Sequence, residues 1–346
     1  MAAFRARAAR RTRPITILPY RGYGNAAKLI LPGRVLEDKG IRPARDRERR
    51  WRNFAAFIRR IESDEVPYAR LRARFQSIEQ ELRADDEGYF RVELSCPGMR
   101  AGWHEVELEL LDDPSVRALG RVIVPPDKAR FAVVSDIDDT VVYSHVTNKL
   151  RMLLTIALSN ARTRKPFAGV GAFYRALHAR VNPFFYVSKS PWNLYVPLAE
   201  YLEVQGLPEG PLFLRNLGLR MPRDHKRAAI SALLQAYPGL PFILIGDSGE
   251  NDPEVYADIV RRFPQRIRVI YIRSVNRQPR RVAAIERLIA QVAPTGCQLV
   301  LAPDSEHAAA HAAAEGLIQA SELRAVRSER KADEKGAIPD NVRNYS

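Results

Sequence analysis

One stretch, FAVVSDIDDT from Phe131 to Thr140, constrains this chain more than any other part of it. Its first half is apolar and predicts a short buried strand, after which three carboxylates follow: Asp136, Asp138 and Asp139. Like charges at such close spacing repel one another and favour protonation. Because hard cations prefer carboxylate oxygens, we expect a metal ion or a shared proton at the end of this strand.

Length and charge limit the classes of protein that the chain can belong to. With 346 residues it is long enough for two domains with sizeable cores. It has 55 Lys and Arg against 40 Asp and Glu, a formal net charge of +15. This surplus favours polyanionic partners, which include anionic phospholipid surfaces, nucleic acid and phosphorylated small molecules, although a solvated basic surface is an equal alternative.

Targeting signals and cysteines indicate a cytoplasmic location, with peripheral binding to a membrane as an option. No apolar run reaches membrane-spanning length, so we predict no transmembrane helix. The basic start, MAAFRARAARRTRP, is not followed by the apolar core of a signal peptide. Only Cys96 and Cys297 occur, which excludes a disulfide framework and suits a reducing compartment.

The part before residue 128 predicts a small β-rich domain. Residues 1–13 form a basic arm that we expect to be disordered, and residues 14–127 a sandwich-like accessory domain. An inserted helix is predicted at Arg45–Ser63, where Trp51, Phe54 and Phe57 follow helical spacing. The expected strands, separated by Gly, Pro and Asp turn signals such as those at 21–24 and 112–114, are Ile15–Leu18, Ala27–Leu31, Tyr89–Leu94, Glu105–Leu111 and Gly120–Val124.

Residues 128–303 predict a different architecture, an α/β domain with a Rossmann-like parallel sheet and helices on both faces. The expected strands are Phe131–Asp138, Pro183–Ser188, Pro211–Leu214, Pro241–Asp247 and Arg266–Ile272. The expected helices are Gly171–Arg180, Pro191–Val204, Asp224–Tyr237, Pro253–Phe263 and Arg280–Val292. Residues 304–346, including the charged run Ser328–Lys335, predict a partly helical tail that runs into disorder.

Polar groups gather at the carboxyl ends of these strands, where ligands bind in such sheets. Ser188 ends the second strand beside a predicted helix start at Pro191, and Lys226 lies in the first turn of a helix. Asp247 and Asp252 follow the fourth strand. These groups suit a magnesium and phosphate site in which a carboxylate attacks phosphorus and a second carboxyl group moves the proton.

Other chemistries lack their sequence signatures. The chain has no EF-hand loop, because Val141 and Thr147 stand where that motif needs Gly and Glu. It also lacks a dinucleotide fingerprint, a P-loop, a G-x-S-x-G elbow and a zinc spacing of Cys and His.

Four motifs follow one another along the chain: Asp136–Thr140, Ser188, Lys226, and Asp247 with Asp252. In this order they resemble the motifs of the haloacid dehalogenase-like phosphatase superfamily, over about residues 129–295. The resemblance implies that Asp136 is the nucleophile and that Asp138 is the general acid and base, with its backbone carbonyl on Mg²⁺. It further implies phosphate contacts from Ser188 and Lys226 and a Mg²⁺ ligand at Asp247. Supporting roles are implied for three further residues, Thr140, Asp252 and Asp139.

A narrower resemblance rests on SDIDDTV, YVSKSPWNLY and IGDSGENDPEVY, and on YRGYG at Tyr20–Gly24. These words are similar to the actin-patch-associated phosphatidate phosphatase catalytic-domain family and its bacterial relatives. The resemblance implies a Mg²⁺-dependent lipid phosphatase that converts phosphatidate to diacylglycerol. Lys189 and Asn216 depart from the family's pattern, so they leave the substrate preference open.

The segment 141–167 predicts a small helical cap insert beside the site. Its apolar helix is flanked by Lys and Arg, so it suits either acyl chains and an anionic membrane surface or simple packing as a lid. Candidate substrate contacts around the site, each with an equally plain structural role, are Lys189, Trp192, Arg215 and His145. For Arg215 we slightly favour an ion pair with Asp247.

Three functions remain open at this point. The first is a phosphatidate phosphatase that acts at membrane surfaces. The second is a phosphatase of soluble or nucleic-acid phosphomonoesters, with the basic surface attracting polyanions. The third is a non-catalytic membrane adaptor, against which the intact set of acids argues.

Overall fold

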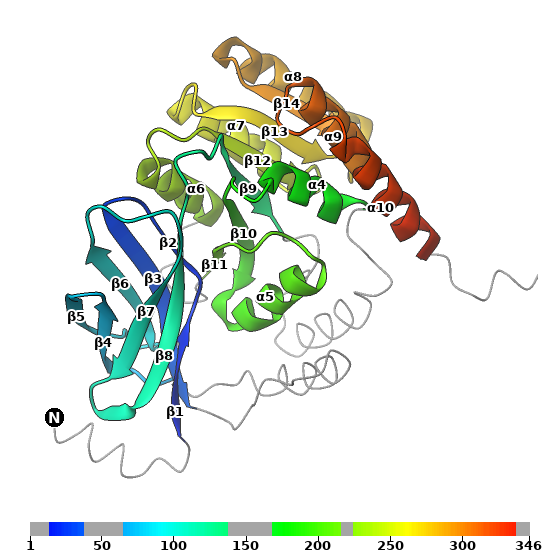
Figure 1. Cartoon of the computed structure of the whole chain (residues 1–346). Coiled ribbons are helices and arrows are strands. Elements are labelled where there is room, and N and C mark those ends of the chain that lie inside the picture. Colours follow the sequence, from blue (N-terminus) through cyan, green and yellow to red (C-terminus); the bar gives the residue numbers. More distant parts are fainter. Residues whose placement is uncertain (1–13, 38–64, 138–167, 216–223, 337–346) are drawn as a thin grey trace, which may run out of the picture. The chain divides into compact units, whose positions relative to one another are not determined.

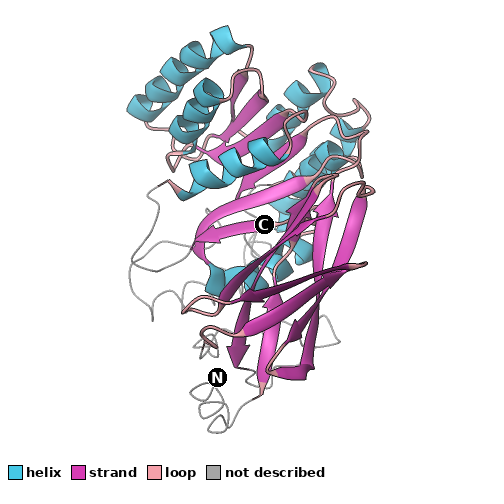
Figure 2. Cartoon of the chain, turned by 90° about the vertical axis from the view of Figure 1, so that its left-hand side faces the viewer, coloured by secondary structure: helices cyan, strands magenta, loops and turns pink. Residues whose placement is uncertain are grey.

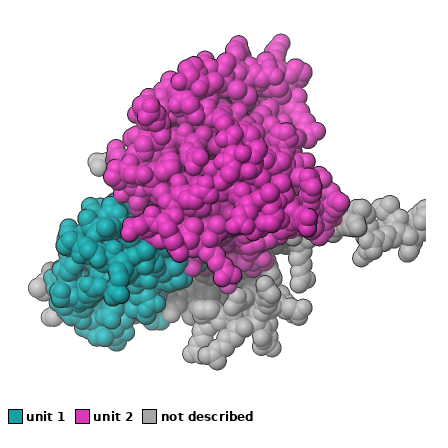
Figure 3. All heavy atoms as spheres, turned by 45° about the horizontal axis from the view of Figure 1, so that its top comes forward, with its two compact units in different colours: residues 1–124 teal, residues 125–346 magenta. Residues whose placement is uncertain are grey.

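The structure, a computed structural model, describes residues 14–37, 65–137, 168–215 and 224–336. The chain divides into two compact units, Met1–Val124 and Pro125–Ser346 (Figure 3). Among the described residues the first unit contains strands only, whereas the second combines strands and helices (Figure 2). Three expectations, the arm at 1–13, the helix at 45–63 and the cap insert at 141–167, lie outside the described residues.

The first unit is built on an eight-stranded sheet in the order β1-β3-β2-β8-β7-β4-β5, with β6 paired to β3. Its strands are β1 (Ile15–Pro19), β2 (Gly22–Gly24), β3 (Lys28–Glu37), β4 (Arg70–Phe75), β5 (Ile78–Arg83), β6 (Tyr89–Ser95), β7 (Gly102–Leu110) and β8 (Asp113–Val124). The sequence pattern predicts β1, β3, β6, β7 and β8, but not β2, β4 and β5. Gly22–Gly24, expected as a turn, is a strand in which a Cβ on Gly22 would lie 2.2 Å from the Ile30 carbonyl oxygen.

Strand β4 shows how alternation builds this unit. Leu71, Ala73 and Phe75 point into the hydrophobic core, and the arginines between them point outward. Arg72 lies opposite Glu81 on β5, where their side chains form an ion pair of 2.8 Å. Because opposite charges face each other across the strands, the exposed face of the hairpin is electrostatically matched.

The second unit contains a parallel sheet in the order β11-β10-β9-β12-β13-β14 (Figure 1). This confirms the predicted parallel sheet with its α/β alternation. Its strands are β9 (Ala132–Asp136), β10 (Phe184–Pro191), β11 (Leu212–Arg215), β12 (Phe242–Asp247), β13 (Ile267–Arg273) and β14 (Gln298–Ala302). Central β9 is buried because apolar side chains fill both of its faces. The sixth strand, β14, is one that the sequence analysis did not predict.

Helices pack against the sheet and against one another in two groups. They are α4 (Val170–His178), α5 (Tyr195–Val204), α6 (His225–Ala236), α7 (Asp252–Arg262), α8 (Pro279–Val292), α9 (Ser305–Ala314) and α10 (Glu322–Gly336). Helices α6, α7 and α8 contact each other in series, while α4, α9 and α10 form a second cluster (Figure 1). No helix among the described residues is long and apolar enough to cross a membrane.

One local expectation is wrong. A helix was expected from Pro191, but β10 continues to Pro191, which pairs with Arg215 of β11, and α5 begins only at Tyr195. The tail, which was expected to be partly helical, contains α9 and α10, and its charged run Ser328–Lys335 lies in α10. That helix is held because Glu329 and Asp333 accept hydrogen bonds from the backbone N–H groups of Ala172 and Gly169 at the start of α4.

Candidate active site

The candidate site lies between β9 and β12, at the point where successive strands stop being added on one side of the sheet and start being added on the other. Strands β9, β10 and β11 succeed one another toward one edge of the sheet, and β12, β13 and β14 toward the other. Asp136 is the last residue of β9 and Asp247 the last residue of its neighbour β12. Their carboxylates therefore meet at the switch point, the position where open α/β sheets bind ligands.

Lys226, in the first turn of α6, ties these strand ends together. Its Nζ lies 2.9 Å from Asp136 Oδ1, 2.9 Å from Glu250 Oε2 and 2.7 Å from Asp252 Oδ1. The lysine side chain is 5% exposed and that of Asp136 is 2% exposed. An ammonium group surrounded by carboxylates in a buried setting is strongly held, because each charge offsets the desolvation of the other.

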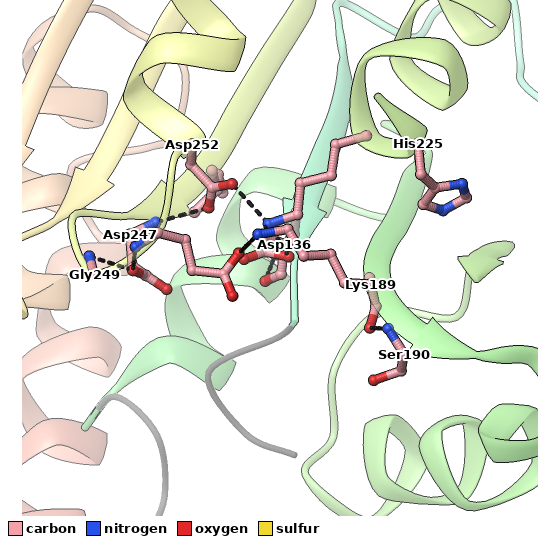
Figure 4. A network of polar contacts seen from close by, with 12 residues as sticks. Asp136, Lys189, Ser190, His225, Asp247, Gly249 and Asp252 are labelled. Atoms are coloured by element: carbon pink, nitrogen blue, oxygen red, sulfur yellow. Dashed lines mark hydrogen bonds and ion pairs between the residues drawn. The ribbon is translucent and has the colours of Figure 1, made fainter. Parts of the chain in front are cut away.

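The loop between β12 and α7 is shaped by its own carboxylates. Asp247 Oδ1 accepts hydrogen bonds from Gly249 N at 2.6 Å and Glu250 N at 3.1 Å. Asp247 N in turn donates to Asp252 Oδ2 at 3.1 Å. Gly246 is required here because a Cβ at that position would lie 2.4 Å from Asp252 Oδ2. The predicted glycine turn thus brings both carboxylates to the rim of the sheet (Figure 4).

Arg281, at the start of α8, braces the same loop from outside. Its Nε donates to the Ser248 carbonyl at 2.8 Å and its Nη2 to the Glu250 carbonyl at 2.5 Å. Glu254 pairs with the guanidinium and fixes its orientation. The backbone that carries Glu250 is therefore anchored at two carbonyl groups.

Burial and neighbouring charge act oppositely on two acids of the loop. Burial, together with repulsion from Asp252, raises the pKa of Asp247 above its usual value. Burial also opposes ionisation of Glu250, but attraction to Lys226 and hydrogen bonding to Lys189 outweigh it and lower the pKa of that carboxyl. Glu250 is therefore held as an anion, while Asp247 is an acid short of compensating positive charge.

Arg273 supplies the positive charge nearest to Asp247. It ends β13, and its Nη2 lies 3.9 Å from Asp247 Oδ2. Burial lowers the pKa of the Arg273 guanidinium, against attraction from Asp136. The expected ion pair between Arg215 and Asp247 is not present among the described residues. Arg215 ends β11, which is separated from β12 by two strands, so Arg273 on the adjacent strand β13 takes that place.

The other side of the site comes from β10. Register places Val187 opposite Asp136, so Ser188 follows directly beside the candidate nucleophile. Ser188 is fully buried, and its Oγ accepts a hydrogen bond from Ser190 N at 2.9 Å. Lys189 points outward and reaches Glu250 Oε2 at 2.6 Å. Figure 4 shows Asp136 between the Asp247–Asp252 loop and this strand end.

Several sequence candidates lie apart from the chemistry or outside the described residues. Trp192 stacks on Tyr195, with ring centroids 6.2 Å apart. His225 was not one of these candidates; its Nε2 lies 3.0 Å from the Phe213 carbonyl oxygen, and its ring stands away from the carboxylates (Figure 4). Asp138, Asp139, Thr140 and His145 belong to the residues that the structure does not describe.

A cavity of about 100 Å³ opens beside the carboxylates. Its lining includes Asp136, Asp247 and Arg273, together with the aromatic residues Phe173, Tyr174 and Tyr271. The hydroxyl of Tyr174 lies 2.7 Å from Ser135 Oγ, which fixes this wall next to Asp136. The site therefore places charged groups against an apolar surface.

Sequence reasoning missed Glu250 and Arg273. Arg273 had a usable signal, since it is the first charged residue after the apolar run Val269–Ile272 and so stands at a strand end. Glu250 had none, because its role depends on how the loop turns. The carboxylate oxygens of Asp136, Glu250 and Asp252 lie within 4.8 Å of one another, a spacing that suits a metal ion, but Lys226 already contacts all three.

The part of the chain that contains the candidate site is similar to a known protein family. Residues 131–274 match the family model described as the catalytic domain of phosphatidate phosphatase APP1. This match covers less than half of the chain and shows that these residues are similar to that catalytic-domain family. They include β9 to β13 and the described carboxylates and cations of the site, apart from Arg281.

Two curated relatives are similar to this chain. Phosphatidate phosphatase APP1 of Saccharomyces cerevisiae is 34% identical over 154 residues, which cover 42% of this chain and 26% of the relative. An uncharacterised protein of Schizosaccharomyces pombe is 26% identical over 239 residues, 64% of this chain and 40% of that one. The chain thus spans less than half the length of either relative. A solved carbohydrate acetylesterase from Xanthomonas citri covers 79% of this chain and 72% of its own, at 11% identity and a TM-score of 0.26, too low to indicate a shared fold.

Proposed function

We propose that the chain is a phosphatase that hydrolyses phosphomonoesters through Asp136, with phosphatidate as its substrate and diacylglycerol as product. The observation that carries the proposal is the contact of Lys226 with the buried Asp136 at the switch point of an APP1-type domain. The resemblance to haloacid dehalogenase-like phosphatases supports the same assignment. A lysine at this distance can offset the charge of the carboxylate and that of an approaching phosphate.

The proposed reaction has two steps. Asp136 forms a bond to phosphorus while the ester oxygen leaves and takes up a proton from Asp138. Water then attacks the aspartyl-phosphate, its proton passes to Asp138, and inorganic phosphate leaves with Asp136 restored. Ser188 and Lys226 would hold the phosphoryl oxygens during both steps.

The described residues fit a magnesium ion. Four carboxylates (Asp136, Asp247, Glu250 and Asp252) meet three cations (Lys189, Lys226 and Arg273), which leaves one negative charge in excess. Asp136 and Asp247 line the same cavity and offer the oxygen ligands that Mg²⁺ prefers. We propose that both hold the ion, with the Asp138 backbone carbonyl, and that the ion offsets phosphate charge when bound.

Asp247→Asn tests the metal assignment through stability. The pKa of Asp247 is raised in the folded protein, so folding favours its protonated form, and stability falls as pH rises from the unfolded pKa through the folded one. Without metal at neutral pH, we therefore expect the variant to be more stable than the parent. Added Mg²⁺ should raise the melting temperature of the parent but not of the variant. Equal shifts in the two proteins would place the ion elsewhere.

The proposed setting is the cytoplasmic face of an anionic membrane. The net charge of +15 supports attraction to anionic lipids, and both free cysteines are buried, which suits a reducing compartment. The same charge would also attract nucleic acid, so soluble and nucleic-acid phosphomonoesters are the competing substrates.

A substrate panel separates these candidates. Initial rates of phosphate release are compared on phosphatidate in mixed micelles, sugar phosphates and 3′-phosphorylated oligonucleotides, with Mg²⁺ and with EDTA. We expect release from phosphatidate to be fastest, to require Mg²⁺, and on vesicles to fall as salt screens the basic surface. Faster release from an oligonucleotide would reject the lipid assignment, and no release from any substrate would favour an adaptor.

A further inference from the structure

Glu250 stands between two lysines at the mouth of the site. A single carboxylate oxygen, Oε2, lies 2.9 Å from Lys226 Nζ and 2.6 Å from Lys189 Nζ. Its side chain is 12% exposed, whereas that of Lys189 is 45% exposed. One anionic oxygen shared by two ammonium groups is the arrangement that a phosphoryl oxygen would also adopt there.

All three N–H groups of Lys226 already have carboxylate oxygens as neighbours. An ammonium group carries three N–H donors, and oxygens of Asp136, Glu250 and Asp252 already lie within 2.9 Å of it. For Lys226 to hold a phosphoryl oxygen, one of these carboxylates has to give up its contact.

Of the three carboxylates, Glu250 can most readily give up its contact with Lys226. Asp252 is 1% exposed, and its other oxygen accepts from Asp247 N. Asp136 has to stay because it faces the reacting phosphorus in the proposed reaction. Glu250 reaches the lysines from a solvent-facing loop whose backbone is held by Asp247 and Arg281, so its side chain can swing out without moving that backbone.

We propose that Glu250 is an internal competitor of the phosphoryl group, occupying the place of one phosphoryl oxygen between Lys189 and Lys226 until substrate or product displaces it. This inference rests on the proposed phosphate site. Its consequence is weaker resting occupancy by every phosphate anion, including released inorganic phosphate and the diester headgroups of a membrane. Displacement thereby favours product release and keeps surrounding lipids from filling the site.

Displacement has a signature that distinguishes it from simple repulsion. If Glu250 blocks the site in most molecules, an anion can bind only to the fraction of molecules in which Glu250 has left the lysines. The affinity of every anion is then reduced by the same factor, which is that fraction. If Glu250 only adds negative potential, a dianion loses more affinity than a monoanion, because Coulomb energy scales with ligand charge.

The test measures dissociation constants by phosphorus NMR titration of the full chain in MgCl₂. The probes are inorganic phosphate at mildly alkaline pH, where it is a dianion, and dimethyl phosphate, a monoanionic diester. Glu250→Gln removes the charge, and Glu250→Asp keeps it on a side chain one methylene shorter. Glu286→Gln, an exposed acid of α8, is the charge-matched control.

We expect both Glu250 variants to bind both probes about tenfold more tightly, as for a competitor bound in about nine molecules of ten. The Glu286 control should match the parent. The inference is overturned if Glu250→Asp behaves like the parent, if Glu250→Gln favours the dianion selectively, or if either variant binds phosphate more weakly. Should the affinities shift as expected while phosphatidate is not hydrolysed, the lipid substrate fails and the competitor stands.

Discussion

Asp136→Asn should reduce phosphate release from phosphatidate by about 10³-fold or more, the size of loss seen when a nucleophile is removed. The neutral amide keeps the shape of the side chain but cannot form the acyl phosphate. It also removes one of three carboxylates around Lys226, so crowding of negative charge falls. We therefore expect the melting temperature to stay the same or rise, which separates lost chemistry from lost folding.

The covalent step can be followed directly. Acid quenching during turnover of phosphatidate labelled in its phosphate should leave label on the parent protein and none on Asp136→Asn. Glu286→Gln, exposed on α8, serves as the active control. A variant that retains more than a tenth of the parent rate, or that still takes up label, would show that another group attacks phosphorus.

The candidate groups that the structure brings together share a physical origin. Asp136 and Asp247 end apolar runs, and parallel strands deliver their carboxyl ends to one edge of the sheet. Lys226 and Asp252 lie in the first turns of helices that follow such strands. Their convergence therefore follows from periodicity alone, and the described geometry brings all four together.

What could not be predicted depends on loop direction and strand neighbours. Glu250 meets Lys189 across 61 positions of sequence. Its direction is set by the hydrogen bonds that Asp247 and Arg281 make to the loop backbone. Arg273 replaces Arg215 beside Asp247 because β13, not β11, adjoins β12. Strand β5 contains two apolar residues, Ile78 and Leu82, so its pattern is too weak to indicate a strand without its partner β4.

Lys226→Met should be the most destabilising single change in the site. Methionine matches the length of the lysine stem but leaves Asp136 and Asp252 without this ammonium group, and leaves Glu250 with Lys189 in place of two lysines. Breaking a buried ion pair from one side costs about 3–5 kcal/mol, because the remaining charge stays desolvated. We expect a loss of that order in the free energy of urea unfolding without metal, together with loss of phosphate release.

A double-mutant cycle identifies the cause of that loss. Asp252→Asn, which removes the most deeply buried of the three carboxylates, should cost less in the Lys226→Met background than in the parent, because the charge it removes has become repulsive. Mg²⁺ should likewise stabilise Lys226→Met more than the parent, since the ion supplies the positive charge that the lysine no longer gives. If Lys226→Met loses less than about 1 kcal/mol, or if the two substitutions are additive, the three carboxylates do not depend on this ammonium group. The proposal that Lys226 balances the charge of these carboxylates would then be wrong.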